Sequence, residues 1–152
     1  MSHHHHNDAD RHAGKRREKH DDDHNEKKAC VIFSTSSPSD AERLASALVE
    51  SGHVACVNIV PGVVSVYRWK GQIERSGECL LIIKCPRANV RAAVETLVKA
   101  HPYEVPEAIV MKVKGGHPEY LNWVLESAPG SPRGESNTSE SLDPVPQRPA
   151  EG

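Results

Sequence analysis

Histidines are concentrated at the start of the chain, where their side chains could bind metal ions. Seven of the ten histidines fall in residues 1–28, namely His3, His4, His5, His6, His12, His20 and His24. Neutral imidazole is a good ligand for Cu(II), Ni(II) and Zn(II), so this composition predicts a weak metal-buffering tail with several sites. Four successive histidines after Met-Ser are also what a cloning remnant or a polar leader without a role would leave, and both interpretations stay open.

A second group of side chains with useful chemistry lies between residues 101 and 107. His101, Tyr103 and Glu107 bring an imidazole, a phenol and a carboxylate to the junction of a predicted helix and a predicted strand. This spacing favours a binding pocket. The alternative is that Tyr103 and Glu107 only complete hydrogen bonds at an interface, while the neighbouring prolines stiffen the turn.

The sequence contains no residue pattern that is typical of an enzyme. It has no nucleophile elbow, no glycine-rich phosphate loop, no H-E-x-x-H motif and no carboxylate pair at a fixed spacing. Cys56 and His101 could act as nucleophile and base, but an apolar strand raises the pKa of a thiol and makes it less reactive. The four cysteines form no C-x-x-C pair, and we expect them to be buried and reduced. We therefore expect a protein that is not an enzyme.

Composition restricts the class of protein further. The chain has 152 residues and a formal net charge of -2, with its basic residues scattered, so nucleic acid is not an expected partner. No stretch approaches the roughly 20 apolar residues that span a membrane, and a cytoplasmic protein is expected. Val, Ile and Leu gather between residues 29 and 127. We predict one domain there, with disordered tails at 1–28 and 128–152.

Hydrophobic periodicity predicts an α+β domain with four strands and three helices. The expected elements, in order, are a strand at 30–35, a helix between Ser37 and Gly52, a strand at 53–69 bulged at Pro61-Gly62, a strand at 72–84 with a break near Ser76-Gly77, a helix from Val90 to about His101, a strand at 107–113 and a helix at 118–125. Lys70-Gly71 would form the turn of a long hairpin. This β-α-β-β-α-β order, with a final helix, is that of a ferredoxin-like sandwich.

The predicted strands are apolar on both faces. The runs Leu80–Ile83, Val54–Val57 and Ile109–Met111 leave no polar side for solvent. Two main helices can cover only one face of such a sheet, and large exposed apolar patches are rare on monomers. We expect a second copy of the chain to cover the other face.

Several motifs then resemble one family. Ala55–Ile59, Pro61-Gly62, Ser65–Gly71, His101–Glu107 and Tyr120–Trp123 occur in the order found in the CutA family, and the likeness covers nearly all of residues 29–127. This resemblance implies a ferredoxin-like fold, a homotrimer interlocked by its long hairpins, and a role in tolerance of copper and other divalent cations.

The resemblance also assigns roles to particular positions. Copper-binding bacterial members use a cysteine at the end of the first strand and a histidine pair before the Pro-Tyr segment, whereas this chain has Ser34, Ala100 and His101 there. Loss of the soft thiolate removes the ligand best suited to Cu(I), so His101 alone remains of that site.

In the family's trimer, a pocket between subunits could combine Cys56, Trp69, Lys84, Tyr103 and Glu107. Trp69 is alternatively a packing anchor near the hairpin end. These residues leave a second function open, in which the chain is a trimeric sensor that holds a small molecule in a cleft between subunits.

Overall fold

The computed structural model describes residues 28–130, so the predicted tails lie almost wholly outside the described residues. Four strands, β1 (Ala29–Ser36), β2 (Cys56–Trp69), β3 (Gln72–Pro86) and β4 (Ile109–Lys112), form one sheet in the order β2-β3-β1-β4. All three strand pairings are antiparallel. The predicted α+β class and the predicted succession of elements are therefore confirmed within this part of the chain.

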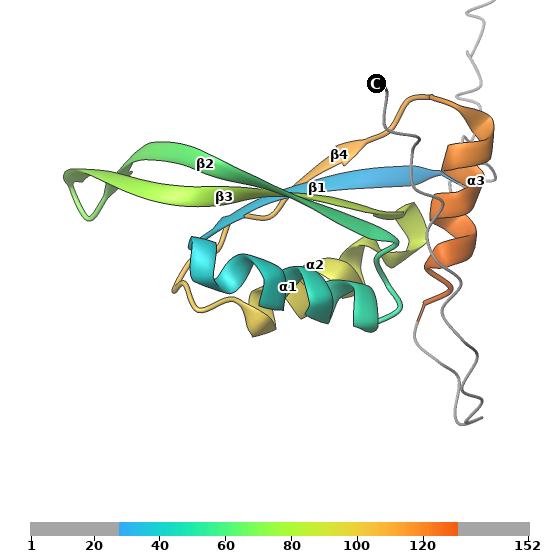
Figure 1. Cartoon of the computed structure of the whole chain (residues 1–152), viewed down its shortest axis with the longest axis horizontal. Coiled ribbons are helices and arrows are strands. Elements are labelled where there is room, and N and C mark those ends of the chain that lie inside the picture. The colour runs from blue at the N-terminus through green and yellow to red at the C-terminus, as the bar shows by residue number, and fades with distance from the viewer. Residues whose placement is uncertain (1–27, 131–152) are drawn as a thin grey trace, which may run out of the picture.

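The helices divide into a packed pair and a separate terminal helix. Helices α1 (Pro38–Glu50) and α2 (Val90–Ala100), the latter preceded by the short 3-10 helix η2 (Arg87–Asn89), lie together on one face of the sheet (Figure 1). Helix α3 (Pro118–Ser127) lies at the end of the sheet away from the hairpin tip (Figure 1). No helix among residues 28–130 is long and apolar enough to cross a membrane.

The predicted start of α1 is confirmed, with one difference in its hydrogen bonds. Ser37 is the N-cap and Pro38 occupies the first helical turn, where its missing N–H leaves no helical bond unmade. The Ser37 hydroxyl donates to the Asp40 carboxylate (2.8 Å) instead of accepting from a backbone N–H. The helix ends at Glu50 and Gly52 follows with φ 78°, a left-handed conformation that suits glycine.

The hydrophobic core lies between the two central strands and the helix pair. Alternate residues of β1 and β3 face the helices and are buried, as the period of two requires. The largest fully buried core side chains are Ile32, Leu81 and Ile83 from the strands, Leu44, Leu48 and Leu97 from the helices, and Val54. The core therefore fixes the two helices against β1 and β3.

Strands β2 and β3 form a hairpin that projects beyond the helices (Figure 1). Lys70 (φ 48°) and Gly71 (φ 78°) make the predicted turn, and the ladder shifts between Val60 and Val63, so the predicted bulge is confirmed. The predicted break near Ser76-Gly77 is wrong. Gly77 pairs with Val64, and the ladder is regular from there to the turn, because a glycine backbone still supplies both hydrogen-bonding groups. On β3 the register shift lies between Glu78 and Leu80 instead.

The sheet face that points away from α1 and α2 is largely apolar, as the sequence predicts. Val31, Phe33 and Ile82 are only half-buried there, while Ile109 and Met111 on β4 are 53% and 50% exposed. β4 itself is shorter than the predicted strand at 107–113, because it pairs with β1 at only four residues. The apolar side chains on this face of β1, β3 and β4 are therefore only partly covered in a single chain.

Candidate functional site

A cavity of about 630 Å³ lies where the projecting hairpin meets the loop that follows α2. This cavity, named here the hairpin pocket, is lined by Thr35, Ser65, Val66, Tyr67, Trp69, Ser76, Glu78, Tyr103, Glu104, Val105 and Glu107. Its volume is in the range of small-molecule sites. The lining combines aromatic rings with three carboxylates and includes no Lys or Arg. Lys70 beside it forms an ion pair with Glu104 (4.0 Å), so a cation would be favoured at Glu78 and Glu107.

Glu78 is the most buried acid of the hairpin pocket. Its residue is 5% exposed, and its Oε2 accepts a hydrogen bond of 2.8 Å from the Tyr103 hydroxyl. Among residues 28–130 no cation pairs with this carboxylate. Glu78 belongs to none of the motifs recognised in the sequence, although a single acid directly before the apolar run Cys79–Ile83 is a signal that could single it out.

Tyr103 is the second polar group of the pocket, and its environment opposes ionisation. Burial raises the pKa of the phenol to about 12, and the hydrogen bond and negative charge of Glu78 act in the same direction. A protonated Tyr103 therefore remains the donor to Glu78 throughout the physiological pH range. Close to Glu78 along β3, the Ser76 hydroxyl lies 3.0 Å from the Tyr67 hydroxyl and shares a hydrogen bond with it.

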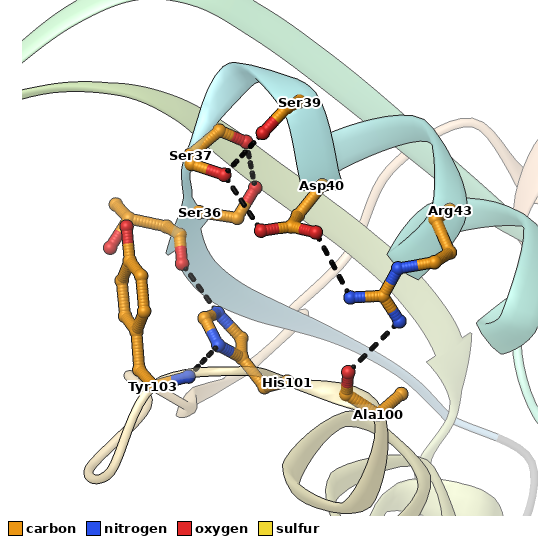
Figure 2. A network of polar contacts seen from close by, with 9 residues as sticks. Ser36, Ser37, Ser39, Asp40, Arg43, Ala100, His101 and Tyr103 are labelled. Atoms are coloured by element: carbon orange, nitrogen blue, oxygen red, sulfur yellow. Dashed lines mark hydrogen bonds and ion pairs between the residues drawn. The ribbon is translucent and has the colours of Figure 1, made fainter.

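His101 is held by backbone groups on both ring nitrogens (Figure 2). Its Nδ1 accepts from the Tyr103 N–H (3.2 Å), so Nε2 carries the proton and donates to the Thr35 carbonyl (2.8 Å). The residue is 7% exposed, and its ring packs against that of Tyr103. A metal ion could bind His101 only by displacing one of these hydrogen bonds, and the ring serves here to position Tyr103.

A polar network beside His101 ties the start of α1 to the end of α2 (Figure 2). Arg43 donates to the Asp40 carboxylate (3.1 Å) and to the Ala100 carbonyl (3.0 Å). The hydrogen bonds from Ser37 and Arg43 lower the pKa of Asp40. Ala100 thus takes part through its backbone carbonyl.

The predicted pocket residues separate into two groups within one chain. Trp69, Tyr103 and Glu107 line the hairpin pocket, whereas Cys56 and Lys84 do not. The latter two are paired across β2 and β3 at the other end of the hairpin.

Lys84 belongs instead to an aromatic group on α3. Its Nζ donates to the Tyr120 hydroxyl (3.1 Å) and lies 5.4 Å from the centre of that ring, which stacks on Trp123. The cation–π contact and the hydrogen bond together hold α3 against β3.

The predicted metal ligands His3, His4, His5, His6, His12, His20 and His24 lie outside the described residues. Within residues 28–130 no three His, Cys, Asp or Glu side chains are close enough to hold a metal ion together.

Comparison with known proteins places the chain in a family. Residues 29–127, well over half of the chain, match the family model described as CutA1 divalent ion tolerance protein. The chain therefore belongs to the CutA1 divalent ion tolerance family, as its motifs suggest. The match spans every strand and helix of the structure.

Individual relatives agree with this assignment. Protein CutA of Mus musculus is 45% identical over 84 residues, which are 55% of this chain and 48% of the relative, so the chain spans about half of that relative's length. The crystal structure of CutA from Xylella fastidiosa is 42% identical with a TM-score of 0.65, covering 66% of this chain and 98% of that one. A Nostoc structure titled PII-like protein CutA, in apo form, is 33% identical with a TM-score of 0.62, covering 65% and 96%.

Ser34 on β1 has an unusual environment. It is fully buried, and its Oγ is the one buried side-chain oxygen or nitrogen among residues 28–130 that lacks a hydrogen-bond partner. Ser36, two residues further on β1, is equally buried, but its Oγ donates to the Ser37 carbonyl at 3.0 Å. The two serines differ in hydrogen bonding at equal burial.

We predict that Ser34→Ala stabilises the chain, because it removes an unpaired buried hydroxyl that costs about 1–3 kcal/mol. Ser36→Ala is the matched control and should lower the free energy of unfolding by about 1 kcal/mol, since it removes a made hydrogen bond. Urea unfolding followed by circular dichroism measures both values. Equal destabilisation by the two substitutions would contradict the assignment of Ser34 as an unpaired group.

A second prediction concerns the ionisation of Tyr103. Because its folded-state pKa is about 12 against an ordinary value of 10.0, the contribution of Tyr103 to stability should be constant below pH 10.0 and be lost as pH rises from there to about 12. The unfolded chain releases the phenol proton first in this window. Tyr103→Phe should remove this part of the alkaline destabilisation.

Spectrophotometric titration of the phenol groups provides a direct measurement. The step near pH 12 should be absent in Tyr103→Phe, and it should move to lower pH in Glu78→Gln, which removes the negative charge but leaves the burial. An unchanged titration curve in Tyr103→Phe would show that another tyrosine carries the high pKa.

Proposed function

We propose that the chain is a cytoplasmic, non-enzymatic divalent-cation tolerance protein that acts as a homotrimer and binds copper or other divalent cations weakly. The observation that carries this proposal is the family match over residues 29–127. The antiparallel sheet order β2-β3-β1-β4, with α1 and α2 on one face, supports a ferredoxin-like sandwich as the protomer.

The uncovered sheet face supports self-association. Phe33 and Ile82 are half-buried in the single chain, and Ile109 and Met111 are about half exposed beside them. Burying apolar area of this kind contributes about 25 cal/mol per Å², so an exposed face of several such side chains favours association. A copy of the same chain provides a complementary apolar face in a closed assembly.

The projecting hairpin supports the same conclusion from a separate part of the chain. Val64, Val66 and Ile73 are 55%, 61% and 64% exposed. The pairings Val66↔Arg75 and Arg68↔Ile73 put these side chains on the hairpin face opposite Tyr67 and Trp69. The projecting end of the hairpin therefore carries exposed apolar side chains, with Arg68 and Arg75 beside them, and is suited to lie on a neighbouring subunit.

We predict that the full chain has three times its single-chain mass in solution, and that Val66→Glu lowers this mass. The charge would be removed from water in the subunit contact, which is costly even with Arg75 opposite residue 66 on β3. Val49→Glu is the matched control, because Val49 is 44% exposed on α1 and lies away from the proposed contact. Light scattering at micromolar concentration measures the masses, and a monomeric unmodified chain would contradict the trimer.

For metal binding, the sequence and the geometry of His101 point to the histidine-rich segment. His101 uses both ring nitrogens for backbone hydrogen bonds, and Ser34 replaces a thiolate with a buried hydroxyl. Seven further histidines precede residue 28 in the sequence, and imidazole binds Cu(II) well. We therefore assign weak Cu(II) binding to these side chains.

The hairpin pocket favours a second candidate function, namely binding of a small cationic molecule. The Glu78 carboxylate is 95% buried with a phenol as partner and no counter-cation in residues 28–130. Buried charges are normally paired, and the adjoining rings of Tyr67 and Tyr103 suit a cation–π contact, while Trp69 already has Lys70 at 5.6 Å from its ring centre. An organic polyamine has the chemistry that this pocket would recognise.

Metal titration of the full chain separates the two candidates. We expect Cu(II) binding by calorimetry to be lost when the seven histidines before residue 28 are changed to Asn, and to persist in the matched variant His101→Asn. Unchanged binding after substitution of the seven histidines would exclude them from the mechanism. A thermal shift with spermidine that disappears in Glu78→Gln, with no shift from Cu(II), would favour the second candidate.

A further inference from the structure

A smaller pocket lies at the end of the sheet away from the hairpin tip. It has a volume of about 220 Å³ and is named here the basic pocket. Its lining residues are Lys28, Ala29, Arg87, Lys112, Val113 and Lys114. The volume lies below the range of typical drug-sized sites, so only a small ligand fits.

The basic pocket concentrates positive charge without any negative partner. Four of its six lining residues are Lys or Arg, none is acidic, and none of the four forms an ion pair within residues 28–130. Arg87 is half-buried, and a partly desolvated guanidinium without a partner is unfavourable. A bound anion would neutralise the repulsion among these cations.

Backbone hydrogen bonds hold the segments of the pocket together. The Arg87 N–H donates to the Lys28 carbonyl (2.7 Å), which joins the start of η2 to the start of β1. The Val113 N–H donates to the Ala29 carbonyl (3.2 Å), which joins the end of β4 to the same point. The cations therefore come from three distant parts of the sequence and meet on a fixed backbone, as a preorganised site requires.

The positive charges of the basic pocket also act on Cys30, a core residue next to it. Cys30 is buried there and is paired with Lys112 in the sheet. Burial raises the pKa of its thiol, and the charges of Arg87 and Lys112 act against this rise. Arg87 and Lys112 are therefore both close enough to Cys30 to affect the ionisation of its thiol.

Protection of the sheet edge accounts for only part of this cluster. Lysines on an edge strand discourage pairing with other chains, and β4 is an edge strand that ends with Lys112. Arg87 begins η2 and Lys28 precedes β1, so edge protection explains neither of them.

We propose that the basic pocket binds a phosphate group, either as a free inorganic anion or on a small metabolite. The planar guanidinium of Arg87 can donate two parallel hydrogen bonds to phosphate oxygens, and the lysines add charge around them. This site is separate from the hairpin pocket, whose three carboxylates would repel the same ligand. It would make the protein responsive to phosphate as well as to cations.

Calorimetric titration of the full chain with inorganic phosphate, pyrophosphate and a sugar phosphate tests the proposal. The double variant Arg87→Gln/Lys112→Gln should bind the preferred anion at least about tenfold more weakly. It removes charged hydrogen bonds to the anion, and each of these contributes to the binding free energy. The matched control is Arg91→Gln/Lys99→Gln, which removes the same charge from exposed positions on α2 and should keep the affinity of the unmodified chain. The preferred anion among the three identifies the source of the phosphate group.

A second measurement needs no substitution. Phosphate added to the unmodified chain should shift the backbone amide resonances of Ala29, Arg87 and Val113 more than those around the hairpin pocket. Absence of binding, equal weakening in the control variant, or shifts spread over the whole surface would overturn the proposal. Phosphate binding that appears only after Asp21, Asp22 and Asp23 are changed to Asn would indicate that this acidic run of the chain itself occupies the pocket. That result would also overturn the proposal.

Discussion

Burial of β1 and β3 against α1 and α2 is the interaction on which the rest of this structure depends. Ile32 on β1 and Leu81 and Ile83 on β3 have essentially no exposed surface, because Leu44, Leu48 and Leu97 pack over them. Full burial of side chains of this size contributes about 1.5–3 kcal/mol each, so this layer supplies most of the folding energy. The same layer leaves two helices on one sheet face and leaves the apolar side chains of the other face uncovered.

The hairpin pocket follows from this arrangement. β1 and the end of α2 are fixed by the core, so the loop after α2 must return past the root of the hairpin. His101 fastens that loop to β1 through the Thr35 carbonyl, and Tyr103 then reaches Glu78 on β3. A histidine that reads as a metal ligand in the sequence is thus a positioning residue in the fold. Its tautomer is set by one backbone donor and one backbone acceptor.

The two pockets are lined by side chains of opposite charge. Three carboxylates line the hairpin pocket, while four Lys and Arg residues line the basic pocket at the opposite end. The net charge of -2 gives no indication of this separation, because the opposite charges nearly cancel in the total. Recognition of charged ligands depends on the local potential of each pocket and not on this sum.

The sequence by itself determined the order of the elements, the start of α1, the hairpin turn and the apolar character of both sheet faces. These features depend on residue types and spacings within short segments, such as Ser37-Pro38 before an amphipathic helix or Lys70-Gly71 between two strands. The family motifs, which are also local, indicated the family that the model match to residues 29–127 shows.

Only the tertiary structure decided which polar groups meet. Cys56 and Lys84 lie at one end of the hairpin with Tyr120, whereas Trp69 and Tyr103 line the pocket at the other. Glu78, Arg87 and Lys112 become candidate binding residues only because of the side chains that surround them. The unpaired hydroxyl of Ser34 and the two occupied nitrogens of His101 are likewise properties of contacts. The physical reason is that hydrogen bonding, burial and potential depend on groups far apart in the chain, whose approach is fixed by core packing.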